Sequence, residues 1–135
     1  IYENSVSALD LGATIVSLSG AAVSKDKPLD GVNLIPFLNG ENKSRPHDTI
    51  YLRQFDRNRF AVRNGNEKII IPWKGAAPQL YDLSNDIGEQ KDIAKERPKR
   101  VLELDFLRKK WNDNLMEPTF LGLIHTAAWA KRKRK

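Results

Sequence analysis

The sequence predicts an α+β fold, in which a small antiparallel sheet of about four strands carries a C-terminal helix on one face and follows an apolar helix. Residues 5–20 and 98–115 repeat apolar side chains at helical spacing, whereas residues 49–83 form short alternating segments divided by turn residues. The chain has 135 residues, of which 40% are apolar, 30% charged and none cysteine. This composition fits one globular core and excludes a disulfide-stapled miniprotein, a collagen-like repeat and a disordered polyampholyte.

The first predicted helix spans residues 5–20. Ser5 or Ser7 can cap its N-terminus, and Gly20 can end it. Its apolar residues fall on several sides of the helix: Val6, Leu9, Leu11, Ala13, Ile15, Val16 and Leu18. A helix that is apolar nearly all round must be covered on more than one face, and little else in this chain is expected to cover it.

Residues 24–48 are expected to form a long connection that runs over a surface. They are rich in Lys, Asp, Pro, Gly and Asn, and Pro36 interrupts their one apolar stretch, residues 32–38. This segment therefore has the weakest local structure of the chain.

Strand patterns begin at Asp48 and continue over residues 59–63. The Asn-Gly dipeptide that follows tolerates the positive φ of a tight primed turn, so residues 59–63 and 67–72 should form a hairpin. A further strand over residues 79–83 completes the meander.

The second helix starts near Pro98, a residue favoured in the first helical turn. Asp105 stands four residues before Lys109, which favours an ion pair along the helix. The apolar residues at helical spacing, which should face the sheet, are Val101, Leu104, Leu107, Trp111 and Leu115. Residues 117–135 are expected to form an extended strap that ends in a basic tail.

The positive charge is concentrated at the C-terminus. The net charge is 23 − 17 = +6, and without residues 131–135 it is 18 − 17 = +1. Arginines also alternate with aromatic residues over positions 51–63, a pattern that could bind single-stranded nucleic acid or that could belong to an ordinary amphipathic sheet. No stretch supplies the approximately 20 apolar residues of a membrane helix.

Residues for catalysis are scarce. The only histidines are His47 and His125, there is no cysteine, and no histidine pair has metal-ligand spacing. His47 is a candidate ligand or acid, or a solvated loop residue. The oxygen-rich stretch 82–89 resembles a calcium loop, but its glycine occupies the seventh position where an EF-hand needs the sixth, so turn chemistry explains it better.

Four segments in order resemble the C-terminal part of the type I sulfatases, which are arylsulfatase-like hydrolases of the alkaline phosphatase superfamily. Residues 7–20 are similar to the family's "DlxPTil…laG" helix, and residues 29–40 to its "LDGxxLxPxLxG" connection. Residues 60–69 are similar to "yAVRxGdwKl", with Asn66 and Glu67 in place of Asp and Trp. Residues 80–89 are similar to "LYDLxxDpxE".

The resemblance implies a larger sulfuric ester hydrolase whose N-terminal domain contains calcium and a formylglycine made from a Cys/Ser-x-Pro-x-Arg signature. Ser44-Arg45-Pro46-His47-Asp48 lacks the final arginine and follows the "LDG" segment, so it is not that signature. The chain also begins at Ile1 without methionine. We therefore expect a fragment that has no metal site or catalytic residue of its own and is inactive in isolation.

The domain organisation expected from the resemblance has four parts. Residues 1–24 form the terminal helix of the missing N-terminal domain, 25–48 the connecting loop, 49–116 the C-terminal subdomain, and 117–135 the strap and tail. In the family this subdomain walls part of the substrate cleft. Three residues are therefore candidate substrate contacts: Arg45, His47 and Arg57.

The expected partners are the missing N-terminal domain and a sulfate-ester substrate, with no membrane. The bare helix at 5–20 could also mediate self-association, and a periplasmic or secreted location is consistent with the family. The alternative is a non-enzymatic basic module that binds nucleic acid or another polyanion through its arginine-rich sheet and tail. The family resemblance makes nucleic acid the weaker expectation.

Overall fold

The computed structural model describes residues 2–119, so His125 and nearly all of the predicted strap and tail lie outside the described residues. The chain divides into two compact units, Ile1–Ile50 and Tyr51–Lys135. Each unit is described by itself below. Within residues 2–119, no helix has the length and apolar character needed to cross a membrane.

The N-terminal unit contains helix α1 (Ala8–Leu18). Ser7 caps this helix, and its side chain and that of Asp10 form a reciprocal capping box with the backbone. Gly20 follows the helix with a φ of 71°, a conformation that glycine adopts without strain. The helix is therefore shorter at both ends than the predicted span of 5–20, because Ser7 caps it and Gly20 lies beyond its last turn.

A second, four-residue helix, α2 (Ile35–Leu38), lies within the predicted connection. The expectation that Pro36 only interrupts this stretch is wrong. Pro36 lies in the first turn of α2, where a helix needs no backbone N–H donor and the fixed φ of proline suits the helical conformation.

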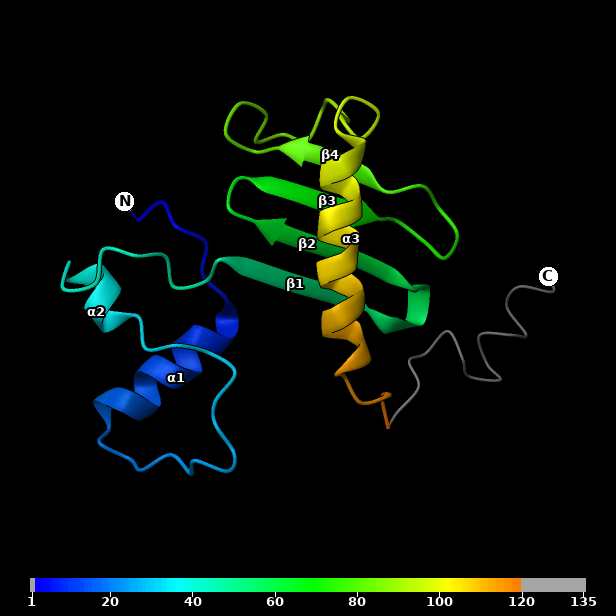
Figure 1. The fold of residues 1–135 in the computed structure, drawn as a ribbon. Coiled ribbons are helices and arrows are strands. Elements are labelled where there is room, and N and C mark those ends of the chain that lie inside the picture. The colour runs from blue at the N-terminus through cyan, green and yellow to red at the C-terminus, as the bar shows by residue number, and fades with distance from the viewer. Residues whose placement is uncertain (1, 120–135) are drawn as a thin grey trace, which may run out of the picture. The chain divides into compact units, whose positions relative to one another are not determined.

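The second unit contains a four-stranded sheet in the order β1-β2-β3-β4, with β2–β3 and β3–β4 antiparallel (Figure 1). Its elements are β1 (Thr49–Gln54), the 3-10 helix η1 (Phe55–Arg57), β2 (Arg59–Asn64), β3 (Glu67–Ile71) and β4 (Gln79–Asp82). The predicted hairpin is present, and β3 ends immediately before Pro72. Its turn uses Gly65, at a φ of 60°, and Asn66, because Asn64 still pairs with Glu67. Positive φ at the first turn residue alone is the type II′ pattern.

Helix α3 (Pro98–Asp113) crosses one face of the sheet (Figure 1). Cross-strand pairing places Val62, Ile69 and Leu80 on that face, where they form a buried cluster with Ile93 and Leu104. Near the C-terminal end of α3, Trp111 stacks on Tyr51 with ring centroids 5.0 Å apart. The predicted α+β fold, a four-stranded antiparallel sheet with a C-terminal helix on one face, is confirmed.

Candidate functional site

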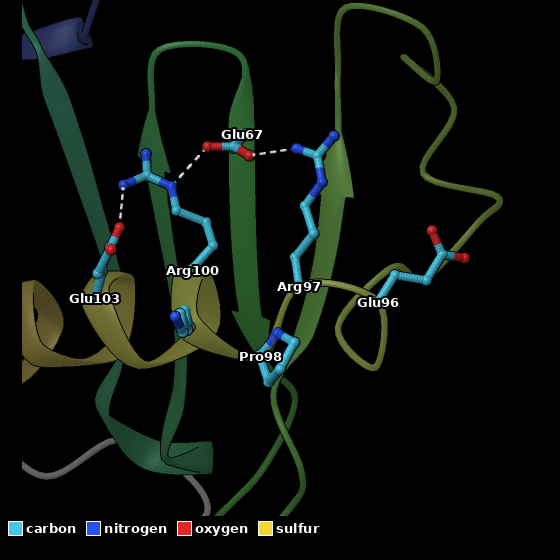
Figure 2. Close-up of a pocket in the computed structure, with 7 residues that line it drawn as sticks. Glu67, Glu96, Arg97, Pro98, Arg100 and Glu103 are labelled. Atoms are coloured by element: carbon cyan, nitrogen blue, oxygen red, sulfur yellow. Dashed lines mark hydrogen bonds and ion pairs between the residues drawn. The ribbon is translucent and has the colours of Figure 1, made fainter.

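A pocket of about 520 Å³ lies beside the first turn of α3. Its lining residues are drawn in Figure 2: Glu67, Glu96, Arg97, Pro98, Lys99, Arg100 and Glu103. Glu67 belongs to the first pair after the β2–β3 turn, opposite Asn64 and Asp82. The hairpin therefore presents one carboxylate to a helix end that carries two arginines.

Glu67 binds both arginines, which lie on opposite sides of it in Figure 2. Nη1 of Arg97 donates to Oε1 at 2.8 Å, and Nε of Arg100 donates to Oε2 at 2.6 Å. Arg100 also donates from Nη1 to Glu103 at 3.0 Å and from Nη2 to Asn64 at 2.6 Å. Burial lowers the pKa of Arg100, but the hydrogen bonds and charges of Glu103 and Glu67 outweigh burial and raise it, so the guanidinium stays charged.

A second polar cluster, entirely within the N-terminal unit, surrounds the buried carboxylate of Asp10. The backbone N–H groups of Ser7 and Val32 donate to it at 2.6 and 3.0 Å. Nε2 of His47 lies 2.8 and 2.9 Å from its two oxygens. Burial raises the pKa of Asp10, but the hydrogen bonds from Ser7, Val32 and His47 and the charge of His47 outweigh burial, so the pKa lies below its ordinary value.

Contacts around Asp10 give a structural role to two residues of the sulfatase-like segments 7–20 and 29–40, namely Thr14 and Gly31. The hydroxyl of Thr14 donates to the carbonyl of Asp10 at 2.6 Å and accepts from the N–H of Leu34 at 2.9 Å. A Cβ on Gly31 would lie 2.2 Å from the carbonyl oxygen of Leu9, which leaves room only for glycine. Residues of two sequence segments thus hold α1 against the connection that follows it.

The three predicted substrate contacts lie in different settings. His47 is not a solvated loop residue, because its ring is 18% exposed and binds Asp10. Arg45, two residues earlier, is exposed. Arg57 is also exposed and ends η1 in the second unit. None of the three lines the pocket beside α3.

Sequence reasoning missed both clusters. The partners of Asp10 and Glu67 stand 37 and 33 residues away in the sequence, at His47 and Arg100. One available signal for the pocket was Glu67 itself, which stands where the family pattern has Trp. A charged residue at an apolar position of a hairpin requires a partner of opposite charge.

The segments considered for metal binding or for the formylglycine signature are held in turns. Ser44 donates from both its backbone N–H and its hydroxyl to Oδ1 of Asn42. Asp82 accepts from Ser84, and Asp86 accepts from the N–H groups of Gln90 and Lys91, as turn chemistry predicts. Among residues 2–119, no group of three or more His, Asp or Glu side chains is placed to hold a metal ion.

The aromatic rings between the arginines of the sheet make contacts within the chain. Tyr51 stacks on Trp111, and the guanidinium of Arg108 lies 4.7 Å above the ring of Phe60. Arg53 lies 4.7 Å above the ring of Phe55. Stacking on nucleic-acid bases would have to displace these contacts.

A four-stranded antiparallel sheet crossed by one C-terminal helix matches the sulfatase C-terminal subdomain. No family model matches the sequence. The relatives identify the class: the chain is homologous to the C-terminal region of sulfatases, so the predicted resemblance is confirmed.

Three relatives illustrate this homology. The chain is 31% identical over 94 residues to the Delta 4,5-hexuronate-2-O-sulfatase of Bacteroides thetaiotaomicron, covering 65% of the chain and 19% of that protein. It is 29% identical over 137 residues to Arylsulfatase A of Bos taurus, covering 78% of the chain and 27% of the relative. The crystal structure of Ps i-CgsB, also solved with k-i-k-neocarrahexaose, matches at a TM-score of 0.78 and 26% identity over 98% of the chain and 29% of its own. The chain thus spans less than a third of each protein.

Proposed function

We propose that this chain is the accessory C-terminal part of a sulfuric ester hydrolase and is inactive in isolation. In this proposal residues 1–24 form the last helix of the catalytic domain, and residues 25–48 form the loop that links this helix to the subdomain. Residues 49–116 form the subdomain beside the substrate cleft, and residues 117–135 form a strap and tail. The support is that the homologues are sulfatases and that α1 leaves a row of apolar side chains exposed.

The exposed row on α1 is the observation that carries the proposal. Leu11, Ile15 and Leu18 are 60%, 67% and 67% exposed and follow one another at spacings of four and three residues. Side chains of this size gain roughly 1.5–3 kcal/mol each when they are fully buried, so an uncovered row is an unfinished interface. The proposed occupant of this interface is the catalytic domain, and a second copy of α1 could cover the row in its absence.

The chemistry of ester cleavage is assigned to the catalytic domain. The calcium ion and formylglycine that the family implies have no fitting residues among those described here, because no cluster of three metal ligands is present and the Ser44 hydroxyl lies in a turn. The residues of this chain would instead contact the substrate. Arg45 and Arg57 would present guanidinium groups to an anionic substrate, whereas His47 would have only Nδ1 available, since Nε2 binds Asp10.

The proposal is tested by sequencing the coding region upstream of Ile1 and by assaying the purified chain for sulfatase activity. The coding sequence upstream of Ile1 should encode a Cys/Ser-x-Pro-x-Arg signature, and the purified 135-residue chain should not hydrolyse 4-methylumbelliferyl sulfate. An upstream frame without the signature, or hydrolysis by the chain alone, would reject the proposal. Sedimentation at high concentration tests the exposed row: Leu11→Glu together with Ile15→Glu should abolish any self-association of the chain.

Polyanion binding is the second candidate function. It rests on the basic tail at 131–135 and on the exposed Arg57 and Arg59. Binding of single-stranded DNA that weakens steeply between about 50 and 200 mM salt and disappears when residues 131–135 are deleted would favour it over the sulfatase role. Feeble binding at physiological ionic strength would reject it.

A further inference from the structure

We propose that Asn39 is a site of spontaneous deamidation, and that the β2–β3 pairing and Arg100 protect Asn64 from the same reaction. These are the asparagines of the two Asn-Gly dipeptides in the chain, Asn39-Gly40 and Asn64-Gly65. In this reaction the backbone nitrogen of the glycine attacks Cγ of the asparagine side chain. Glycine favours the attack because it has no Cβ to hinder a close approach of its backbone. The reaction needs only water, so it does not depend on the proposed function.

The modification proceeds through a cyclic imide. A bond forms between the backbone nitrogen of Gly40 and Cγ of Asn39, and the bond from Cγ to Nδ2 breaks. Nδ2 leaves as ammonia with the proton that the Gly40 nitrogen gives up. Water then opens the imide at either of its two carbonyls, which yields aspartate or isoaspartate. In sum, one water molecule is consumed and one ammonia molecule is released.

The fold leaves the first dipeptide accessible. Asn39 and Gly40 are both exposed and follow the last turn of α2. Gly40 has a φ of 83°, and nothing lies within 4 Å of the place that a Cβ on it would take. Within residues 2–119, no hydrogen bond engages the N–H of Gly40. The attacking nitrogen is therefore neither shielded nor held by another group.

The second dipeptide is held in place. Asn64 lies in β2 and pairs with Glu67 across the hairpin. Its Oδ1 accepts from Nη2 of Arg100 at 2.6 Å. The next peptide is restrained as well, because Nε of Arg63 donates to the carbonyl oxygen of Gly65 at 3.0 Å. Rotation of the Gly65 nitrogen toward Cγ of Asn64 would have to break the strand pairing at this point.

Restraint, and not polarisation of the amide, separates the two sites. Both side-chain oxygens accept a hydrogen bond, but the donor to Asn39 is the N–H of Glu41, which belongs to the same turn. The donor to Asn64 belongs to α3, and Arg100 is itself fixed by Glu67 and Glu103. Reacting atoms must approach to about 3–3.5 Å in the right orientation, and a misplacement of about 1 Å can slow a reaction about 10²-fold. The restrained asparagine is therefore the slower one.

Deamidation of Asn39 changes this turn in two ways. Either product adds a negative charge, which lowers the net charge to 6 − 1 = +5. Isoaspartate also inserts one carbon atom into the backbone directly before Gly40. The N–H of Asn42 donates across this position to the carbonyl oxygen of Pro36 at 2.7 Å. The longer backbone of isoaspartate is expected to break this hydrogen bond and to loosen the end of α2.

The test is an incubation of the folded 135-residue chain in warm, mildly alkaline buffer, followed by mass spectrometry of its tryptic peptides. Conversion of Asn39 should be at least about tenfold faster than conversion of Asn64. Asn42 is the matched internal control, because it is exposed in the same connection but precedes lysine, and it should convert much more slowly than Asn39. In concentrated urea, Asn39 and Asn64 should convert at similar rates, because the unfolded chain restrains neither.

Two variants separate the roles of the glycine and the arginine. Gly40→Ala should slow conversion of Asn39 by about tenfold, because the added methyl group hinders the attacking nitrogen. Arg100→Ala should speed conversion of Asn64 by about threefold to tenfold and leave Asn39 unchanged, because it removes a hydrogen bond from a charged donor. Its control is Lys110→Ala, which removes an exposed cation from the last turn of α3 and should change neither rate.

Three outcomes would overturn the inference. Equal conversion of the two asparagines in the folded chain would show that the fold protects neither. A difference that persists in urea would place its cause in the neighbouring residues and not in the fold. An unchanged rate at Asn64 in a folded Arg100→Ala chain would remove the protective role of the arginine. If circular dichroism shows that Arg100→Ala is unfolded, the comparison of folded and urea-unfolded wild type decides alone.

Discussion

Different interactions stabilise the interior of each of the two units. In the second unit, the buried residues are mainly apolar and include Val62, Ile69, Leu80 and Leu104, each fully buried. Among residues 2–50 of the N-terminal unit, the one residue with no exposed surface is Asp10, a charged side chain. The second unit thus has an apolar core of its own, whereas hydrogen bonds to one carboxylate organise the N-terminal unit.

The apolar residues of the N-terminal unit lie mainly on its surface. Large apolar side chains of α1, including Leu9, Leu11, Ile15 and Leu18, are each more than half exposed. Burial of apolar surface is the main stabilising term in folding, so a unit that leaves this surface in water gains little stability from it. The polar cluster fixes the conformation of the unit, and the apolar face remains available for a neighbouring surface.

The largest effect is expected for Leu104→Ala in the core of the second unit. Truncation of a fully buried leucine should lower the free energy of unfolding by about 2–5 kcal/mol, because it removes apolar burial and leaves a cavity. Urea denaturation followed by circular dichroism measures this change. The control is Leu102→Ala, a 71% exposed residue on the same helix, which should change stability by less than about 0.5 kcal/mol. Equal effects of the two variants would contradict the described packing of α3.

The next effect is expected for Gly31→Ala and should be confined to the N-terminal unit. The added Cβ would lie 2.2 Å from the Leu9 carbonyl oxygen, so backbone must move, at a cost of about 1–3 kcal/mol. Amide NMR signals of Asp10 and Val32 should shift or broaden, whereas those of Ile69 should not change.

Gly12→Ala is the matched control for Gly31→Ala, since nothing lies within 4 Å of its added Cβ. This glycine lies within α1, so alanine should stabilise the helix by roughly 0.5–1 kcal/mol. A variant of Gly31 that left the Asp10 and Val32 signals in place would disprove the close approach of the connection to α1.

The sequence could predict the second unit far better than the first. Local signals specify the hairpin, through Gly65 next to alternating apolar residues, and the start of α3, through Pro98. The Asp10–His47 pairing joins residues 37 positions apart and has no local signal. The same limit applies to Glu67 and its two arginines, because a residue's charge does not identify its partner. Polar clusters built from distant residues are therefore the part of this molecule that required a structure.

Acidification should affect the N-terminal unit through Asp10. Its pKa is lower in the folded chain than the value of about 3.9 of an unfolded aspartate, so its stabilising contribution is complete above that value and is lost as pH falls through the folded pKa. Between pH 6 and 2, the part of the Val32 amide shift that follows protonation of Asp10 should therefore have its midpoint below about 3.9. Asp10→Asn should remove this titration. A midpoint above about 3.9 for the transition that Asp10→Asn removes would contradict the lowered pKa.

The smallest effect is expected for Glu67→Gln, which removes the charge shared by Arg97 and Arg100. The side chain of Glu67 is 21% exposed, so solvent screens the pair only partly, and the loss should be about 1 kcal/mol in low salt. Because the interaction is ionic, the difference between wild type and variant should shrink in 1 M salt, where the Debye length is about 3 Å. Glu41→Gln, an exposed residue of the N-terminal unit, is the control and should have no measurable effect. A salt-independent loss would mean that Glu67 acts through packing and not through its charge.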